Sequence, residues 1–145
     1  MPILLIYASP AQAPNLIDFL QKVNLPTSDL PTDLSGFTLA FDGEQIVGSA
    51  GMELLGNRGL LRSVAVAETH RNQQLGQRLF AVALDYARSH HVQEVFLITN
   101  TAARYFEKNG FQEIERSQVP KEISQTEQFS ALCPSTAVVM KMELN

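Results

Sequence analysis

Residues 61–79 constrain the fold more than any other stretch, because an apolar strand there runs almost directly into an amphipathic helix. The run 60–67 is typical of a buried strand, and residues 74–90 repeat apolar side chains at helical spacing. Only a short polar turn that contains Arg71 separates the two predicted elements. The first N–H groups of a helix lack partners within it, and the helix dipole favours negative charge there. The junction therefore predicts a binding site for an anionic group.

The remaining apolar segments predict short strands and helices along the whole chain. Asp42-Gly43 between two apolar runs is typical of a tight hairpin, and the run VFLI at 95–98 is typical of a strand buried on both faces. This order predicts one domain over 1–145 of the α/β (α+β) class, with a mixed, mostly antiparallel sheet flanked by helices. We expect strands at 3–8, 37–41, 45–55, 60–67, 92–99, 111–116 and 136–144, and helices at 10–25 or 14–25, 74–90, 101–109 and within 119–131.

Composition argues against several classes of protein. With 45% apolar residues and a net charge of −4, the 145-residue chain is typical of a globular domain and has no electrostatic footprint for nucleic acid. The apolar start, 1–7, lacks a basic flank and is too short for a signal peptide or membrane span, so we expect a cytoplasmic protein with no membrane partner. A single cysteine, Cys133, excludes an internal disulfide, and three histidines without ligand spacing predict no metal site.

The turn before the central helix carries the first recognisable motif. Residues 71–76 read RNQQLG, which resembles the R/Q-x-x-G-x-G/A signature of the GNAT N-acetyltransferase superfamily. Arg71 and Gly76 match the signature, whereas Gln74 stands where its first glycine is usual. At positive φ a glutamine there costs about 1–2 kcal/mol, and at negative φ it costs nothing. An ordinary strand–helix corner is the alternative interpretation of these residues.

This resemblance implies an acyl-CoA site with acetyl-CoA as the cofactor. The backbone of Val64 and Val66 would pair with the pantetheine arm. The amides of residues 72–77 would hold the pyrophosphate, with Arg71 adding positive charge. The implied cofactor contacts are Val64, Ala65, Val66, Arg71, Asn72, Gln73, Gln74, Leu75, Gly76, Gln77, Thr99 and Phe106.

A second motif, AARYFEKNGF at 102–111, resembles the superfamily segment A-x-x-L-Y-x-K-x-G-F. Phe106 occupies the position that often holds a tyrosine acid, and Tyr105 precedes it. Adjacent helical residues point about 100° apart, so Tyr105 does not simply replace the missing hydroxyl. Tyr105 is a candidate general acid, and a packed ring with a solvated hydroxyl is the alternative. A general acid typically raises the rate about 10²–10⁴-fold. The thiol of CoA, with a pKa of about 8.5, is a good enough leaving group to need only modest help from an acid.

Segments over nearly the whole chain carry a closer resemblance. They are VNLPTSDL, GSAGMELLGNRGLLRSVAV, LITNTAARYFEKNGF and ALCPSTAVVMKMEL, and they resemble the arsenic-resistance N-acetyltransferase branch of the GNAT proteins. The resemblance implies a detoxifying acyl transfer from acetyl-CoA to a small amine-bearing acceptor. GNAT resemblance is also compatible with a homodimer.

Two charged side chains are candidates for the acceptor side. Glu53 lies within the apolar run 52–55, where burial would raise the pKa of its carboxyl and make it a base; a solvent-facing glutamate is the alternative. Strand alternation places Arg62 on one face with Val64 and Val66. From that face Arg62 would clamp a carboxylate, phosphonate or arsenate-like group. An ion pair between Arg62 and Glu53 is the alternative.

Cys133 and Ser135, before the last predicted strand, are further candidates for substrate contacts. Cys133 is a candidate soft ligand or reactive thiol, and a small buried hydrophobe is the alternative.

These residues predict an acetyltransferase that works through a ternary complex without a covalent intermediate. The amine, deprotonated by Glu53 or by a water chain, would attack the thioester directly, and the backbone N–H of Val64 or its neighbour would stabilise the oxyanion. A catalytically silent CoA-binding sensor is the alternative that Gln74 and Phe106 favour. A metalloid-binding protein that uses Cys133 is a third.

Overall fold

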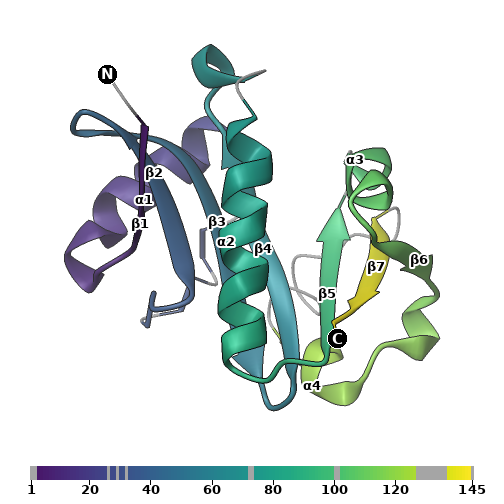
Figure 1. Ribbon diagram of the computed structural model, residues 1–145. Helices are drawn as coiled ribbons and strands as arrows, with labels where there is room; N and C mark the ends of the chain where they lie inside the picture. Colours follow the sequence, from purple (N-terminus) through teal and green to yellow (C-terminus); the bar gives the residue numbers. More distant parts are fainter. Residues whose placement is uncertain are drawn as a thin grey trace.

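The computed structural model describes residues 3–25, 27–28, 30–31, 33–71, 74–99, 102–126 and 137–144. Its strands form a seven-stranded sheet in the order β1-β2-β3-β4-β5-β7-β6 (Figure 1). The strands are β1 Ile3–Tyr7, β2 Phe37–Asp42, β3 Gln45–Leu55, β4 Arg58–Val66, β5 Glu94–Thr99, β6 Gln112–Ile114 and β7 Val138–Glu143. The α-helices are α1 Ala13–Lys22, α2 Leu75–Ser89, α3 Ala103–Lys108 and α4 Lys121–Ser124.

Neighbouring strands are antiparallel throughout this sheet except for β4 and β5, which run parallel. The β2–β3 hairpin turns where Asp42 pairs with Gln45, and Gly43 supplies the positive φ (63°) that a tight turn needs. Between β4 and β5 the chain passes through α2, because parallel neighbours need a long crossover connection. The prediction of a mixed, mostly antiparallel sheet flanked by helices is confirmed.

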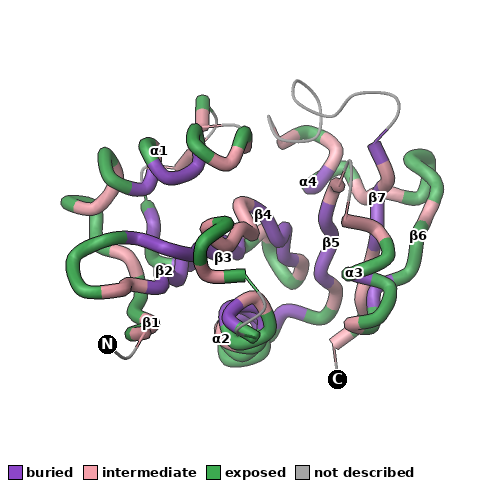
Figure 2. Tube along the Cα trace, turned by 90° about the horizontal axis from the view of Figure 1, so that it is seen from above, coloured by how far each residue is buried: buried purple, intermediate pink, exposed green. Residues whose placement is uncertain are grey.

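Helices cover both faces of the sheet (Figure 2). On one face α1 packs through Leu16 and Leu20, and the short helix α4 packs through Ile123. On the opposite face α2 packs through residues such as Leu79, and α3 joins the same cluster through Phe106. Full burial of one such apolar side chain is worth about 1.5–3 kcal/mol. The apolar periodicity of α1 and α2 therefore fixes which face of each helix meets the sheet.

The first helical segment begins in two steps, one at the predicted start Pro10 and the other one residue before the predicted start Pro14. A 3-10 turn, Pro10–Gln12, comes first, and the Ser9 N–H donates to Gln12 Oε1 at 2.8 Å. The α-helix starts at Ala13, so Pro14 occupies its first turn, where a missing N–H leaves no intrahelical bond unmade.

Ion pairs connect β4, β5 and β7 at the parallel pair in the centre of the sheet. Glu94 accepts from Arg58 Nε at 3.1 Å and from Lys141 Nζ at 2.9 Å, which links β5 to β4 and β7. Arg58 Nη1 also pairs with Glu122 of α4 at 2.9 Å. The hydrogen bond from Lys141, followed by that from Arg58, lowers the pKa of the Glu94 carboxyl against the opposing effect of its partial burial.

We expect Glu94→Gln to lower the free energy of unfolding at pH 7 by at most about 1 kcal/mol, because the partners are partly exposed. Since the folded pKa of Glu94 is lowered, its contribution is present above the unfolded value of about 4.3 and disappears as the pH falls through the folded value. Urea unfolding at pH 7, 5 and about 3.5 measures this loss. The variant and the wild type should converge in acid, while Glu44→Gln in the exposed β2–β3 turn serves as control. A difference that stays constant with pH would contradict the assignment.

Candidate active site

The central parallel pair of strands opens at one end. The β4–β5 ladder consists of Arg58 with Glu94, Gly59 with Val95, and Leu60 with Phe96. Beyond Leu60 and Phe96 the two strands continue but diverge (Figure 1). Backbone N–H and C=O groups need partners, and along the diverging part of β4 they have none from β5 within the described residues. The open end of the β4–β5 pair can therefore hydrogen-bond an extended ligand as a neighbouring strand would.

A β-bulge interrupts β4 at this opening. Gly51 pairs with Arg62 and Ser49 pairs with Ala65, so two residues of β4 stand opposite a single residue of β3. Ser63, the first of the two, has a φ of 55°, in the left-handed region. An extra residue of this kind bends the strand and reverses its side-chain alternation.

The bulge corrects the prediction that Arg62 shares a face with Val64 and Val66. Both valines pack against the cluster on the α2 side, whereas Ala65 packs against the cluster that contains α1. Arg62 lies two residues after Leu60, which packs against α4, and α4 and α1 cover the same face of the sheet, so Arg62 shares the face of Ala65. The alternation rule failed because it assumes a strand without insertions.

Glu53 and Arg62 form an ion pair on the face that carries α1 and α4. Arg62 Nη1 donates to Glu53 Oε1 at 2.7 Å, and Nε donates to Ser63 Oγ at 3.2 Å. The Arg62 side chain is 1% exposed and that of Glu53 is 23% exposed. The ion pair that the sequence allowed is thus present, and water reaches the carboxylate but hardly the guanidinium.

The start of α2 has the backbone that the glycine-containing signature requires. Gln74, the residue before the helix, has φ 60° and ψ 15°, so the positive φ considered for this position is present and costs about 1–2 kcal/mol. A Cβ at Gly76 would lie 3.3 Å from Tyr105 Oη and 3.7 Å from Val66 Cγ2. Gly76 therefore lets β4 and α3 approach the first turn of α2 closely.

The other predicted cofactor residues near this turn differ in their exposure and in their hydrogen bonds. Leu75 is buried and Gln77 is exposed. Arg71 is exposed at the turn and its Nε donates to Val66 O at 3.3 Å, which places its side chain back along β4. Thr99 Oγ1 accepts from the Ala102 N–H at 3.0 Å and so closes the connection from β5 to α3. Four predicted site residues lie outside the described residues: Asn72, Gln73, Cys133 and Ser135.

The two aromatic residues of the second motif have separate environments. Phe106 is buried, with ring centroids 6.5 Å from Phe80 and 5.7 Å from Phe111. Tyr105 is 36% exposed and directs its hydroxyl toward Gly76, and partial burial raises the pKa of its phenol. The hydroxyl therefore stays protonated at neutral pH and can act as a hydrogen-bond donor beside α2.

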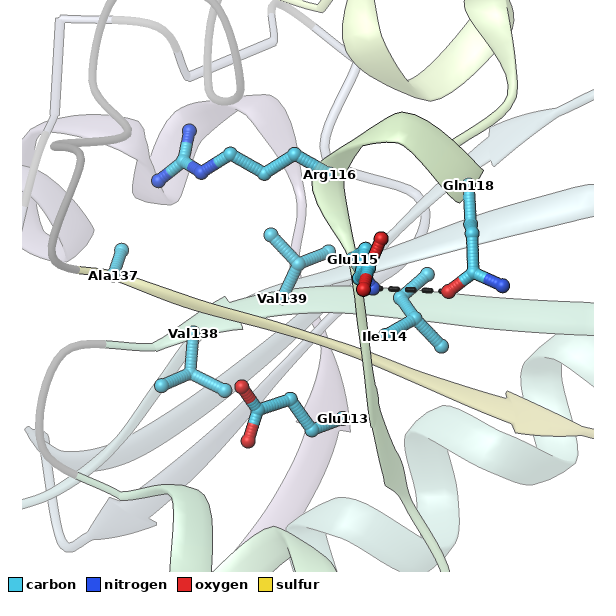
Figure 3. Close-up of a pocket in the computed structure, with 8 residues that line it drawn as sticks. All are labelled: Glu113, Ile114, Glu115, Arg116, Gln118, Ala137, Val138 and Val139. Atoms are coloured by element: carbon cyan, nitrogen blue, oxygen red, sulfur yellow. Dashed lines mark hydrogen bonds between the residues drawn. The ribbon is translucent and has the colours of Figure 1, made fainter.

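The described residues also line two hollows, and the sequence predicted neither. One of about 720 Å³ lies between β6 and β7, where Figure 3 shows Arg116 on one side and Glu113 on the other, and where the Glu115 N–H donates to Gln118 Oε1 at 3.0 Å. The other, of about 800 Å³, lies between α1 and the turn that contains Arg71. Arg71 is the only described candidate site residue that lines either hollow.

Among the described residues, no three His, Cys, Asp or Glu side chains are grouped so as to hold a metal ion. Within those residues, no helix has the length and hydropathy needed to span a bilayer.

A mixed sheet whose central parallel pair opens beside the start of a helix is the architecture of the acyl-CoA N-acyltransferase fold. The profile of the acetyltransferase (GNAT) family matches residues 7–111. The chain therefore belongs to the acetyltransferase (GNAT) family, which is a family of acyltransferases. No curated protein matches the sequence.

Solved structures share this fold at low sequence identity. N-acetylglutamate synthase from Neisseria gonorrhoeae, complexed with coenzyme A and N-acetyl-glutamate, is 16% identical with a TM-score of 0.84; the match covers 100% of this chain but only 36% of the synthase. A GNAT-family acetyltransferase from Staphylococcus aureus Mu50 is 22% identical with a TM-score of 0.81, over 99% of this chain and 100% of that one. Rv2747 from Mycobacterium tuberculosis, in complex with CoA and NLQ, is 19% identical with a TM-score of 0.80, over 98% and 99% of the two chains.

Proposed function

We propose that this protein transfers an acetyl group from acetyl-CoA to the amine of a small acceptor, by direct attack in a ternary complex. The observation that carries the proposal is the open end of the β4–β5 pair, which lies beside the first turn of α2. The family provides the reaction class, and structural neighbours were solved with coenzyme A bound.

The residues around this turn fit the proposed cofactor. Gln74 holds the left-handed backbone that usually belongs to a glycine, and Gly76 leaves room that a Cβ would fill. The N–H groups at the start of α2 would hold the pyrophosphate with Arg71, and the backbone of 64–66 would bind the pantetheine arm. Tyr105 would donate its hydroxyl toward the cofactor. When bound, acetyl-CoA supplies the acetyl group as an activated thioester.

The acceptor side of the proposal rests on Glu53 and on one backbone amide. Glu53, which water reaches, would take a proton from the acceptor ammonium, directly or through a water molecule. The N–H of Val64 would donate to the acetyl carbonyl oxygen as negative charge develops on it. Phe106 is buried and has no hydroxyl, so the thiolate would leave without an acid at that position.

We further infer that the acceptor is a small amine that carries an anionic group, of the kind that the arsenic-resistance branch implies. The four segments resembling that branch support this choice. The amines to test are amino acids and their phosphonate and arsonate analogues. Cys133 and Ser135 remain candidates for contacts with the anionic group, whereas the Arg62 guanidinium is buried in its ion pair with Glu53 and is not a candidate for this contact.

Calorimetry with acetyl-CoA tests the proposed function, with desulfo-CoA and ATP as controls. We expect micromolar binding of acetyl-CoA and of desulfo-CoA, which keeps the pantetheine arm, and much weaker binding of ATP, which lacks it. Absence of heat at millimolar acetyl-CoA would overturn the proposal. A thiol-release assay over the named amines then identifies the acceptor, and sedimentation of the same sample shows whether the protein is a dimer.

A catalytically silent CoA-binding sensor is the second candidate, because the usual position of the acid is a buried phenylalanine. A sensor would bind acetyl-CoA yet release no thiol with any amine. A gain of turnover in Phe106→Tyr would instead show that the missing acid limits a real reaction.

A further inference from the structure

The bulge in β4 contains a strained residue that its surroundings hold in place. Ser63 has a φ of 55° in the middle of a strand, a conformation that costs a residue with a side chain about 1–2 kcal/mol. The Ser49 hydroxyl donates to the Ser63 carbonyl at 2.6 Å, and Arg62 Nε donates to the Ser63 hydroxyl at 3.2 Å. Both the main chain and the side chain of Ser63 are therefore anchored.

The anchoring groups are buried polar residues in an otherwise apolar layer. Ser49 is fully buried, and Arg62 is buried and pairs with Glu53. Burial of a polar group costs free energy unless it is hydrogen-bonded, and apolar side chains of similar size would avoid this cost. Ser49, Arg62 and Ser63 make hydrogen bonds at the bulge itself, which points to a role in fixing its geometry.

The geometry matters because a bulge reverses the direction of backbone groups as well as side chains. Successive N–H groups of a strand point to alternate sides. The extra residue of the bulge therefore decides which N–H groups after Ser63 point toward the open end of the β4–β5 pair. Val64 follows Ser63 directly, so the orientation of its N–H is set by the conformation of Ser63. A displacement of about 1 Å of a catalytic group can cost about 10²-fold in rate.

We propose that Ser49, Arg62 and Ser63 are positioning residues that aim the Val64 N–H at the acetyl carbonyl oxygen. This inference rests on the proposed function, because the carbonyl is that of acetyl-CoA. In this role the network sets how strongly the carbonyl is polarised and leaves the affinity for the cofactor unchanged.

Carbon-13 NMR of [1-¹³C]acetyl-CoA bound to the purified protein tests the inference without an acceptor. We expect the wild type to move the carbonyl resonance downfield from its free position. Ser49→Ala should lose most of this displacement and about 10²-fold in kcat, with KM and Kd for acetyl-CoA within threefold of the wild type. Ser89→Ala is the matched control, because Ser89 also donates to a carbonyl, that of Tyr86 at 2.8 Å, on the far end of α2.

Ser63→Gly separates positioning from stability. Glycine adopts this φ without strain, so the variant should unfold at or above the wild-type temperature, yet it loses the anchor to Arg62 and should show a reduced carbonyl displacement. A wild-type displacement in both Ser49→Ala and Ser63→Gly, with acetyl-CoA bound, would overturn this inference and leave the proposed function standing. Failure of the wild type itself to bind acetyl-CoA would overturn both.

Discussion

Glu53→Gln is expected to lower kcat for acetyl transfer by about 10²–10⁴-fold, the range typical of a lost general base. The glutamine amide oxygen still accepts the hydrogen bond that Arg62 Nη1 donates at 2.7 Å, so the fold should be retained. In the proposed complex acetyl-CoA would lie on the other side of the reaction centre from Glu53, so its KM should change less than threefold. Initial rates of thiol release with the acceptor found in the screen measure both constants.

The control for this variant is Glu94→Gln, which removes a carboxylate from the ion network at the closed end of β4 and β5. It should leave kcat unchanged. A rate for Glu53→Gln within threefold of the wild type would show that Glu53 serves the structure only, and that solvent takes the proton.

Glu53→Ala is expected to lower the free energy of unfolding by about 3 kcal/mol, the lower end for removal of one partner from a buried ion pair. Alanine leaves the Arg62 guanidinium, which is almost fully buried, without its carboxylate. The bond from Arg62 to the Ser63 hydroxyl remains, which keeps the loss at the lower end. Urea unfolding of the variant measures it.

Removal of the other partner by Arg62→Met should lower the free energy of unfolding less than Glu53→Ala does, because water already reaches the Glu53 carboxylate. The double variant Glu53→Ala/Arg62→Met should then lose less stability than the summed losses of the two single variants, and the difference gives a coupling energy of about 1–3 kcal/mol. The exposed pair of Arg88 and Asp85, 3.4 Å apart, is the control, and its removal should cost under about 0.5 kcal/mol. Additive losses at Glu53 and Arg62 would contradict this coupling.

Much of the fold could be predicted because its signals are local. Asp42-Gly43 marked the β2–β3 hairpin, and the periodicity of residues 74–90 marked α2. The polar turn between a strand and this helix marked the place where β4 and α2 meet. Each of these features depends on residues that are close in sequence.

The details of the site were harder to predict because they depend on single backbone torsions. The bulge at Ser63 could not be predicted, because serine does not indicate a left-handed conformation. Because of the bulge, Arg62 lies on the face of the sheet opposite to Val64 and Val66. For Gln74 the sequence left the sign of φ open, and the structure shows it to be positive. The Ser49 hydroxyl was missed because a small polar residue in a strand resembles any solvent-facing serine until its partner is known.

The short β4–β5 ladder also has a consequence for the order in which the chain folds. β2, β3 and β4 are joined by tight turns, so their ladders close short loops, whereas Arg58 meets Glu94 across a separation of 36 residues. Loop closure costs more entropy as the separation grows, and contacts of high contact order form late. We expect the β2–β3–β4 meander to form early and β5 to dock late, once α2 has been laid across the sheet. The nascent chain would then acquire its ligand site only in the final stage of folding, so partly folded molecules would not sequester the cofactor.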